Sequence, residues 1–295
     1  MNDVKSARAF MVVDLVKLSP QSHVFDGISQ LINRSISGAP VVSETGEYLG
    51  LFSEKCSMHI LRETAKLADF ERTPVKEFMA TDLVTLSPKA DVFDAISDLI
   101  SRKVSGAPVV DDAGNFVGVF SEKTAMQVLI AAAYDRLPGT SVDSYMNTER
   151  ERLIDEDVEL MEVVRIFEET PYRRLPVVKN NKLLGQVSRR DVLRTEHHLS
   201  GYLHAEPDAQ GIRDSQVSDE IRQQLPTGKI DLFMDRDAKT ITPDDDIFSI
   251  AQVFWNSPYR RLPVLEYGKL VGQVSRRDLL VAADDLLNGI EQKYD

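Results

Sequence analysis

The sequence predicts an α/β (α+β) protein in which four β-α-β-β-α motifs pack as two pairs. Two observations lead to this prediction. The sequence repeats itself four times, in two versions, and every repeat has the same order of strand-like and helix-like segments. Internal repetition of this kind is typical of an architecture built from one small supersecondary unit.

The first version of the repeat occupies the N-terminal half. SGAPVV occurs at 37–42 and again at 105–110, while GLFSEK at 50–55 matches GVFSEK at 118–123. Both matches are separated by 68 residues. We call these two repeats unit 1 and unit 2.

The second version of the repeat follows in units 3 and 4. PYRRLPV occurs at 171–177 and 258–264, and GQVSRRD occurs at 185–191 and 272–278, both with a separation of 87 residues. One proline and one glycine per unit align the two versions with each other: Pro40, Pro108, Pro176 and Pro263, then Gly50, Gly118, Gly185 and Gly272.

The first half of a unit is illustrated by unit 2. A β-rich run, LVTL, at 83–86 is ended by a Ser-Pro step. A helix is expected next, because apolar residues then recur at helical spacing. The residues expected on its apolar face are Phe93, Ile96, Leu99 and Ile100.

The second half of the unit contains a hairpin and a second helix. Runs at 107–110 and 116–120 are expected to form two strands, and Ser121 is placed to cap the helix that follows. A unit of roughly 60 residues buries too little core to be stable alone. We therefore expect units to pair by burying their helical faces together.

The repeats divide the chain into four motifs and one linker. The expected boundaries are 7–67, 68–137, 138–195 and 230–287 for the motifs and 196–229 for the linker. Neighbours in sequence usually lie together, which favours pairs 1–2 and 3–4. The order of the two versions also fits the insertion of one pair into another, which would give pairs 2–3 and 1–4.

Composition limits the classes of function. The chain has 295 residues and a formal net charge of −12, so nucleic acid and anionic membranes are not expected partners. No apolar run reaches the ~18 residues needed to span a bilayer. The N-terminus has no pattern of a signal peptide, and Cys56 is the single cysteine. These features fit a cytoplasmic protein.

The units resemble CBS motifs, which are named for cystathionine β-synthase. The resemblance is carried by RRLPV…GQVSRRD at 173–191 and 260–278 and covers nearly the whole chain. Such motifs work in pairs called Bateman modules, and four occur in the gamma subunit of AMP-activated protein kinase. The resemblance implies two such modules here, with ligand sites between paired units.

Ser-x-x-Asp occurs where the second helix of units 3 and 4 begins. A carboxylate can accept hydrogen bonds from both hydroxyls of a ribose, and the resemblance assigns that role to Asp191 and Asp278, beside Ser188 and Ser275. The alternative is a capping box, which stabilises any helix start. Units 1 and 2 carry Cys56 and Thr124 at the acidic position, which favours the ribose role and predicts impaired sites there.

Four arginine pairs flank the two acidic positions, and units 1 and 2 lack them. Guanidinium groups bind phosphate oxygens bidentately, so we expect an anion site. Surface arginines that pair with other carboxylates are the alternative. Thr240, where relatives often place a ligand contact, is the last candidate. The arginine candidates are Arg173, Arg174, Arg189, Arg190, Arg260, Arg261, Arg276 and Arg277.

These features predict a non-catalytic regulatory protein that senses AMP, ADP or ATP and signals to a protein partner by conformational change. Mg²⁺ could accompany ATP, and no prosthetic group is expected. The output requires an effector protein or a homodimer. A scaffold or dimerisation module with degenerate sites is the alternative. An enzyme is not expected, because the repeats fill the chain and leave no room for a catalytic domain.

Overall fold

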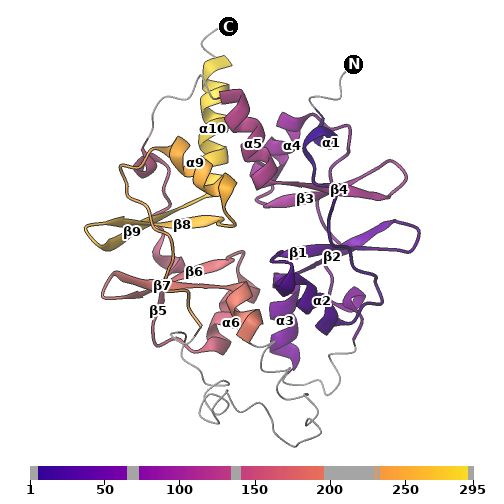
Figure 1. Cartoon of the computed structure of the whole chain (residues 1–295), viewed down its shortest axis with the longest axis horizontal. Helices are drawn as coiled ribbons and strands as arrows, with labels where there is room; N and C mark the ends of the chain where they lie inside the picture. Colours follow the sequence, from indigo (N-terminus) through magenta and orange to yellow (C-terminus); the bar gives the residue numbers. More distant parts are fainter. Residues whose placement is uncertain (1–5, 65–72, 134–140, 196–229, 231–232, 292–295) are drawn as a thin grey trace, which may run out of the picture.

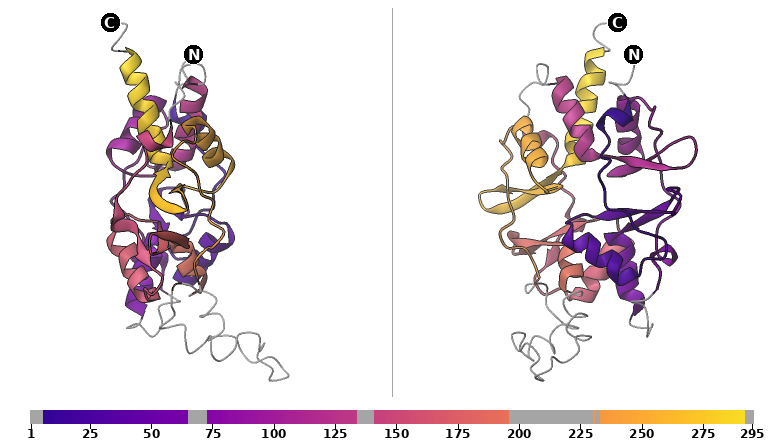
Figure 2. Two further views of the ribbon diagram at one scale, coloured as in Figure 1. Left: turned by 90° about the vertical axis from the view of Figure 1, so that its left-hand side faces the viewer. Right: turned by 45° about the vertical axis from the view of Figure 1, so that its right-hand side comes forward.

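The computed structural model describes residues 6–64, 73–133, 141–195, 230 and 233–291. The predicted linker at 196–229 lies outside these residues. Units 1 and 2 form one side of the molecule and units 3 and 4 the other (Figure 1). The assembly is flattened, as its narrow edge view shows (Figure 2).

Every unit contains an antiparallel hairpin, and helices precede and follow it. The labelled elements are α1 (Ala7–Phe10), α2 (Val24–Asn33), β1 (Gly38–Val42), β2 (Tyr48–Ser53), α3 (Glu54–Thr64), η3 (Val75–Glu77), α4 (Val92–Ser101), β3 (Gly106–Val110), β4 (Phe116–Ser121), α5 (Glu122–Ala133), η4 (Val142–Ser144), η5 (Arg150–Arg152), β5 (Ile154–Asp155), α6 (Leu160–Glu169), β6 (Arg174–Lys179), β7 (Lys182–Ser188), α9 (Ile247–Asn256), β8 (Arg261–Glu266), β9 (Lys269–Ser275) and α10 (Arg276–Glu291). Residues 189–195 of unit 3 are also helical.

The first strand of each unit is shorter than predicted. The run at 83–86 contributes a single parallel bridge, in which Leu86 N donates to Pro108 O and Leu86 O accepts from Val110 N, both at 2.9 Å. A longer ladder would need a donor from residue 108, and proline has no N–H. Pro40 and Pro263 limit the pairing in the same way. In unit 3 the pairing continues for one more residue, so that Ile154 and Asp155 of β5 both pair with β6.

The apolar stripe of α4 also differs from the prediction. Val92, Ala95, Ile96 and Leu99 are buried, as a stripe with steps of three and four residues requires. Phe93 is 41 % exposed, because it lies one residue beyond Val92 and therefore points away from the stripe.

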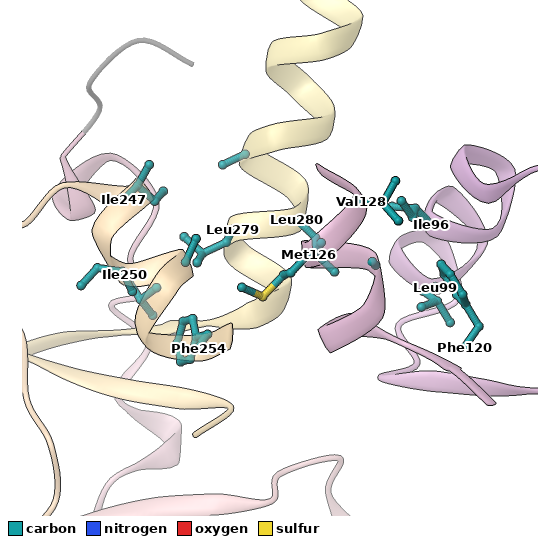
Figure 3. Packing of buried hydrophobic residues seen from close by; sticks show 14 of the residues in the cluster. Ile96, Leu99, Phe120, Met126, Val128, Ile247, Ile250, Phe254, Leu279 and Leu280 are labelled. Atoms are coloured by element: carbon teal, nitrogen blue, oxygen red, sulfur yellow. The ribbon is translucent and has the colours of Figure 1, made fainter. Parts of the chain in front are cut away.

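The helical faces are buried between units of different halves of the chain. One hydrophobic core joins units 2 and 4, where α5 packs against α9 and α10. Figure 3 shows Met126 and Val128 of α5 between Leu99 of unit 2 and Leu280 of unit 4. The other core joins units 1 and 3, where α3 packs against α6. Units therefore bury helical faces together as expected, but between units 2 and 4 and between units 1 and 3, which neither predicted pairing contains.

Sequence neighbours pair through their hairpins instead. The N-terminal segment of unit 4 forms a bridge with β7 of unit 3, since Asp235 and Gln186 exchange backbone hydrogen bonds of 2.7 and 2.9 Å. Asn147, in the N-terminal segment of unit 3, pairs in the same way with Gln273 of β9. Units 1 and 2 make equivalent bridges. The pairs are thus 1–2 and 3–4, and the alternative pairing 2–3 and 1–4 is wrong.

The glycine that all units share marks these crossings. A Cβ added at Gly185 would lie 2.6 Å from the carbonyl oxygen of Asp235, which real Cβ atoms do not approach. The equivalent glycines in the other three units face the segment of the paired unit at 2.7–2.8 Å. Glycine is therefore required for the close approach of two backbones.

Gly185→Ala is expected to lower the free energy of unfolding by about 1–3 kcal/mol, because the added methyl group forces the segment at Asp235 away from β7. Urea unfolding measures the change. Lys182→Ala, at an exposed position of the same strand, is the control. An unchanged midpoint for Gly185→Ala would show that the crossing tolerates a side chain.

Candidate functional site

The four units meet at one polar centre, to which each contributes the same position of the repeat. Arg173 of unit 3 donates from Nη1 to Ser37 Oγ at 3.3 Å and from Nη2 to Ser105 Oγ at 2.7 Å. Arg260 of unit 4 donates to the same two hydroxyls at 3.0 and 3.4 Å. Two arginines and two serines therefore close a ring around the centre.

The two central arginines carry like charges and are partly buried. Burial and, to a smaller degree, the charge of Arg173 lower the pKa of Arg260 to about 10. The pKa of Arg173 is also lowered, again mainly by burial. Both remain cationic at neutral pH, and their hydrogen-bond partners in the ring are neutral hydroxyls.

Two buried carboxylates oppose the arginines from the other half of the chain. Glu54 of unit 1 bonds to Arg190, with Oε1 at 3.1 Å from Nη2 and 3.2 Å from Nε. Glu122 of unit 2 lies 3.5 Å from Nη2 of Arg277. Glu54 and Glu122 are 7 % and 9 % exposed. The alternative that surface arginines pair with distant carboxylates thus holds for Arg190 and Arg277.

Sequence reasoning missed the importance of these glutamates. They occupy the repeat positions of Arg189 and Arg276, so units 1 and 2 carry an acid where units 3 and 4 carry a base. That reversal of charge at one aligned position was the available signal.

Arg189 and Arg276 have structural partners. Nη2 of Arg189 donates to the carbonyls of Phe167 and Thr170 at 2.8 and 3.0 Å, at the C-terminal end of α6. Arg276 makes the equivalent bonds, both of 3.0 Å, at the end of α9. Helix ends expose carbonyls that need donors and favour cations. These two side chains, 4 % and 5 % exposed, therefore hold helices rather than face an open site.

Asp191 and Asp278 form capping boxes. Oδ2 of Asp191 accepts from the backbone N and the hydroxyl of Ser188 at 2.8 and 2.7 Å. Asp278 accepts from the same groups of Ser275, both at 2.7 Å. Among the described residues, neither Oδ1 has a hydrogen-bond partner. One oxygen of each carboxylate thus stabilises the helix, and the other is available to a ligand.

Units 1 and 2 keep the cap without the acid. The amide of Cys56 donates to Ser53 Oγ at 3.3 Å, and that of Thr124 to Ser121 Oγ at 3.4 Å. The absence of the acid in these units therefore does not argue against a capping role in units 3 and 4. It does leave units 1 and 2 without a carboxylate at this position.

The two remaining candidate arginines, Arg174 and Arg261, occupy the same position of the repeat but differ in their hydrogen bonding. Nη1 of Arg174 donates to Gln186 Oε1 at 3.1 Å. Nη1 of Arg261 is buried and has no acceptor among the described residues. Burial and, to a smaller degree, the charge of Arg152 lower the pKa of Arg261 to about 10.

Arg152 was not among the sequence candidates. It belongs to η5, in the N-terminal part of unit 3, and its guanidinium carbon lies 4.6 Å from the centre of the Tyr172 ring. Its Nε is buried without an acceptor in the described part of the chain. Sequence reasoning missed it because it lies outside the runs at 171–177 and 185–191 that match unit 4.

A cleft of about 210 Å³ lies where units 3 and 4 cross. Ligand pockets usually measure roughly 300–1,000 Å³, so this cleft fits a base or sugar rather than a whole nucleotide. Its lining mixes polar and apolar groups. The lining residues are Asn147, Thr148, Glu149, Arg150, Leu153, Asn181, Leu270, Val271, Gly272 and Gln273.

Thr240 is exposed and immediately precedes Ile241, which forms the single parallel bridge of unit 4. It does not line the cleft between units 3 and 4.

The balance of charge distinguishes this region from the rest of the chain. The eight arginines of the four pairs outnumber the four nearby carboxylates, Glu54, Glu122, Asp191 and Asp278. The whole chain carries −12. No group of three metal-binding side chains occurs among the described residues, and no helix there is long and apolar enough to cross a membrane.

The fold and the site define a repeat protein that assembles four β-α-β-β-α units around a shared cationic centre. A family model for the CBS domain matches residues 7–55, 75–131, 142–198 and 229–285. The chain therefore belongs to the CBS-domain family.

Similar proteins occur in archaea. MJ1225 of Methanocaldococcus jannaschii is 24 % identical over 210 residues, which are 70 % of this chain and 69 % of that protein. MJ1404 of the same organism is 24 % identical over 205 residues, 66 % of this chain and 48 % of that protein.

Solved structures show the same fold. The crystal structure of MJ1225 aligns with a TM-score of 0.78 at 19 % identity, covering 94 % of this chain and 99 % of that one. It is described as a candidate archaeal homologue of the gamma subunit of AMP-activated protein kinase. A conserved protein of Pyrococcus horikoshii aligns with a TM-score of 0.58 at 18 % identity, with the same coverage.

Asp278→Ala is expected to lower the free energy of unfolding without ligand by about 0.5–2 kcal/mol, because it removes the acceptor of the Ser275 amide. Asp278→Asn, which keeps an acceptor oxygen, should remain near the wild type. Chemical unfolding of both variants measures the difference. Equal stability of the alanine variant and the wild type would contradict the capping role.

Proposed function

We propose that this chain is a non-catalytic regulatory protein that senses AMP, ADP or ATP at units 3 and 4 and signals to a protein partner by conformational change. The excess of arginines over carboxylates at the four-unit junction carries the proposal. A concentrated cationic centre within an acidic protein attracts anions from solution. The description of MJ1225 as a candidate gamma-subunit homologue is consistent with it.

The ribose would be held by the available oxygen of each acid. Oδ2 of Asp191 and Asp278 is occupied by the cap, so Oδ1 would accept the hydroxyls. This division lets one carboxylate cap a helix and bind a sugar. Since the cap fixes the rotamer, the free oxygen is already oriented before a ligand arrives.

The phosphates would be bound by the central arginines. Arg173 and Arg260 now donate to hydroxyls of serine, which are neutral acceptors. A phosphate oxygen is a stronger acceptor for guanidinium and matches its planar fork. Exchange of Ser37 and Ser105 for phosphate would also relieve the repulsion between the two cations.

The base would enter the cleft between units 3 and 4. The cleft includes Gly272 and Gln273 of β9, and the same strand ends at Ser275, next to the capping box of Asp278. Units 1 and 2 have no ionised acceptor at Cys56 or Thr124 for a ribose. We therefore place the ligands at units 3 and 4 alone.

The signal would arise at the two glutamate contacts. Arg190 and Arg277 join the halves of the chain through Glu54 and Glu122. A phosphate that reaches these arginines competes with the glutamates and so weakens the contact between halves. The ligand would then bind more tightly to the arrangement in which these contacts between halves are broken. That difference in affinity is what a conformational response requires.

Wild-type protein is expected to bind two nucleotides per chain, and Asp191→Asn and Asp278→Asn are each expected to bind one. The charge of the carboxylate strengthens its bonds to the ribose hydroxyls, while asparagine preserves the cap. Calorimetric titration with AMP, ADP and ATP measures the stoichiometry. Asp112→Asn removes the same charge at an exposed turn of unit 2 and is the matched control.

Absence of heat at millimolar nucleotide, in wild-type protein that is folded, would refute nucleotide sensing. It would favour the second candidate function, a scaffold or dimerisation module. The structural partners of Arg189 and Arg276, and the capping by both aspartates, are the observations that favour this alternative.

Glu54→Gln is expected to tighten nucleotide binding about fivefold at the Asp191 site, because Arg190 loses its anionic competitor and a charged contact contributes on the order of 1 kcal/mol. Titration of Glu54→Gln in the Asp278→Asn background measures this. Glu122→Gln in the same background is the control, since its partner Arg277 adjoins the other site. Unchanged or weaker binding in Glu54→Gln would contradict competition.

A further inference from the structure

Two arginines lie near the boundary between units 3 and 4. Arg152 lies in η5, in the N-terminal part of unit 3, and Arg261 begins β8 of unit 4. They lie within electrostatic reach, because the charge of Arg152 lowers the pKa of Arg261. The charges of Asp278 and Glu122 raise this pKa, and that of Arg277 lowers it. Arg261 pairs across the hairpin with Ser275, whose amide donates to Asp278, so the group adjoins the proposed nucleotide site.

Both arginines present donors without acceptors. Arg152 Nε and Arg261 Nη1 are buried, and neither has a partner among the described residues. A buried donor left unsatisfied costs about 1–3 kcal/mol, more when charged. Two such donors on neighbouring cations indicate that an acceptor belongs there.

The nearby carboxylates do not supply that acceptor. Glu122 contacts Arg277, and Oδ2 of Asp278 is used by Ser275. The ion pair of Arg152 with Glu149 is long, at 3.8 Å, and the side chain of Glu149 is 59 % exposed. The excess positive charge between Arg152 and Arg261 is therefore not neutralised by these groups.

Arg152 is held in place and remains reachable. Its guanidinium group lies over the ring of Tyr172, a cation–π contact that restricts its orientation. The side chain is 19 % exposed, so solvent reaches part of it. Its sequence neighbours Arg150 and Leu153 line the cleft between units 3 and 4.

The Asp191 site has no equivalent. Arg174, the counterpart of Arg261, has its acceptor in Gln186 at 3.1 Å. Lys239 is the counterpart of Arg152 in unit 4, because Lys239 stands two residues before Ile241 and Arg152 stands two residues before Ile154. Lys239 is exposed. The two proposed sites therefore differ in the number of cationic donors that lack an acceptor.

We propose that Arg152 and Arg261 form a subsite for an additional phosphate group at the Asp278 site. This site then selects nucleoside di- or triphosphates over monophosphates, whereas the Asp191 site does not. The subsite is a diphosphate-binding site in its own right. Only the attachment of its ligand to adenosine rests on the proposed function.

The test uses the full chain with Asp191→Asn, so that one site remains. Calorimetry compares AMP, ADP and inorganic pyrophosphate for this protein and for the same protein with Arg152→Met. The ratio of ADP to AMP affinity is expected to fall about tenfold, the loss expected for one charged hydrogen bond, and pyrophosphate binding should fall likewise. Arg102→Met, at an exposed arginine of unit 2, is the control.

Arg152→Lys separates a binding role from a folding role. Lysine keeps the charge, so this variant should retain part of the preference for ADP, while both variants must match the parent in thermal midpoint. If Arg152→Met does not fold, the test relies on Arg152→Lys alone. An ADP-to-AMP affinity ratio in Arg152→Lys equal to that of the parent would then overturn the proposal.

The outcomes distinguish this proposal from the proposed function. Pyrophosphate binding that depends on Arg152, without binding of AMP or ADP, would support the subsite and refute adenine-nucleotide sensing. Equal ADP-to-AMP ratios in parent and Arg152→Met would refute the subsite and leave nucleotide sensing standing. Equal losses of AMP and ADP would also overturn the subsite.

Discussion

The arrangement of the molecule depends on the contact of Arg173 and Arg260 with Ser37 and Ser105. Each unit supplies one residue, from the same position of the repeat, so the ring exists only when all four units are assembled. The contact places two cations side by side in a partly buried position. Such a junction is stable because surrounding cores hold it, and it remains attractive to any anion that can replace neutral hydroxyls.

Two kinds of interface hold the four units together. Hairpin crossings at the shared glycines join units within a pair, and helical cores join one pair to the other. The proposed ligands would act at both, because the cleft lies at a crossing and the glutamate contacts lie between pairs. A ligand that changes one interface would then also change the other, because side chains at the same helix starts take part in both.

The order of elements, the four units and the two Ser-x-x-Asp positions could be predicted from repetition and local pattern. The roles of individual side chains could not. Arg189 and Arg190 are neighbours with equal charge, yet one caps a helix end and the other pairs with Glu54. Their difference follows from helix geometry and from a partner 136 residues away. The exposure of Phe93 depends on its register on the helix. The short first strands depend on the N–H that proline lacks. Hydrophobic spacing alone predicts neither.

Opposite charges at one aligned position have a consequence for symmetry. Glu54 and Glu122 stand where units 3 and 4 carry Arg189 and Arg276. The partners of these glutamates, Arg190 and Arg277, stand one position further along the repeat, where units 1 and 2 carry Lys55 and Lys123. A homodimer of the second half would therefore place Arg189 opposite Arg190, and these side chains would repel each other. Joining the halves in one polypeptide allowed each to specialise, one as counter-ion and the other as receptor. A single-chain pseudo-dimer can also carry the ring of two arginines and two serines, which no true homodimer of either half could assemble.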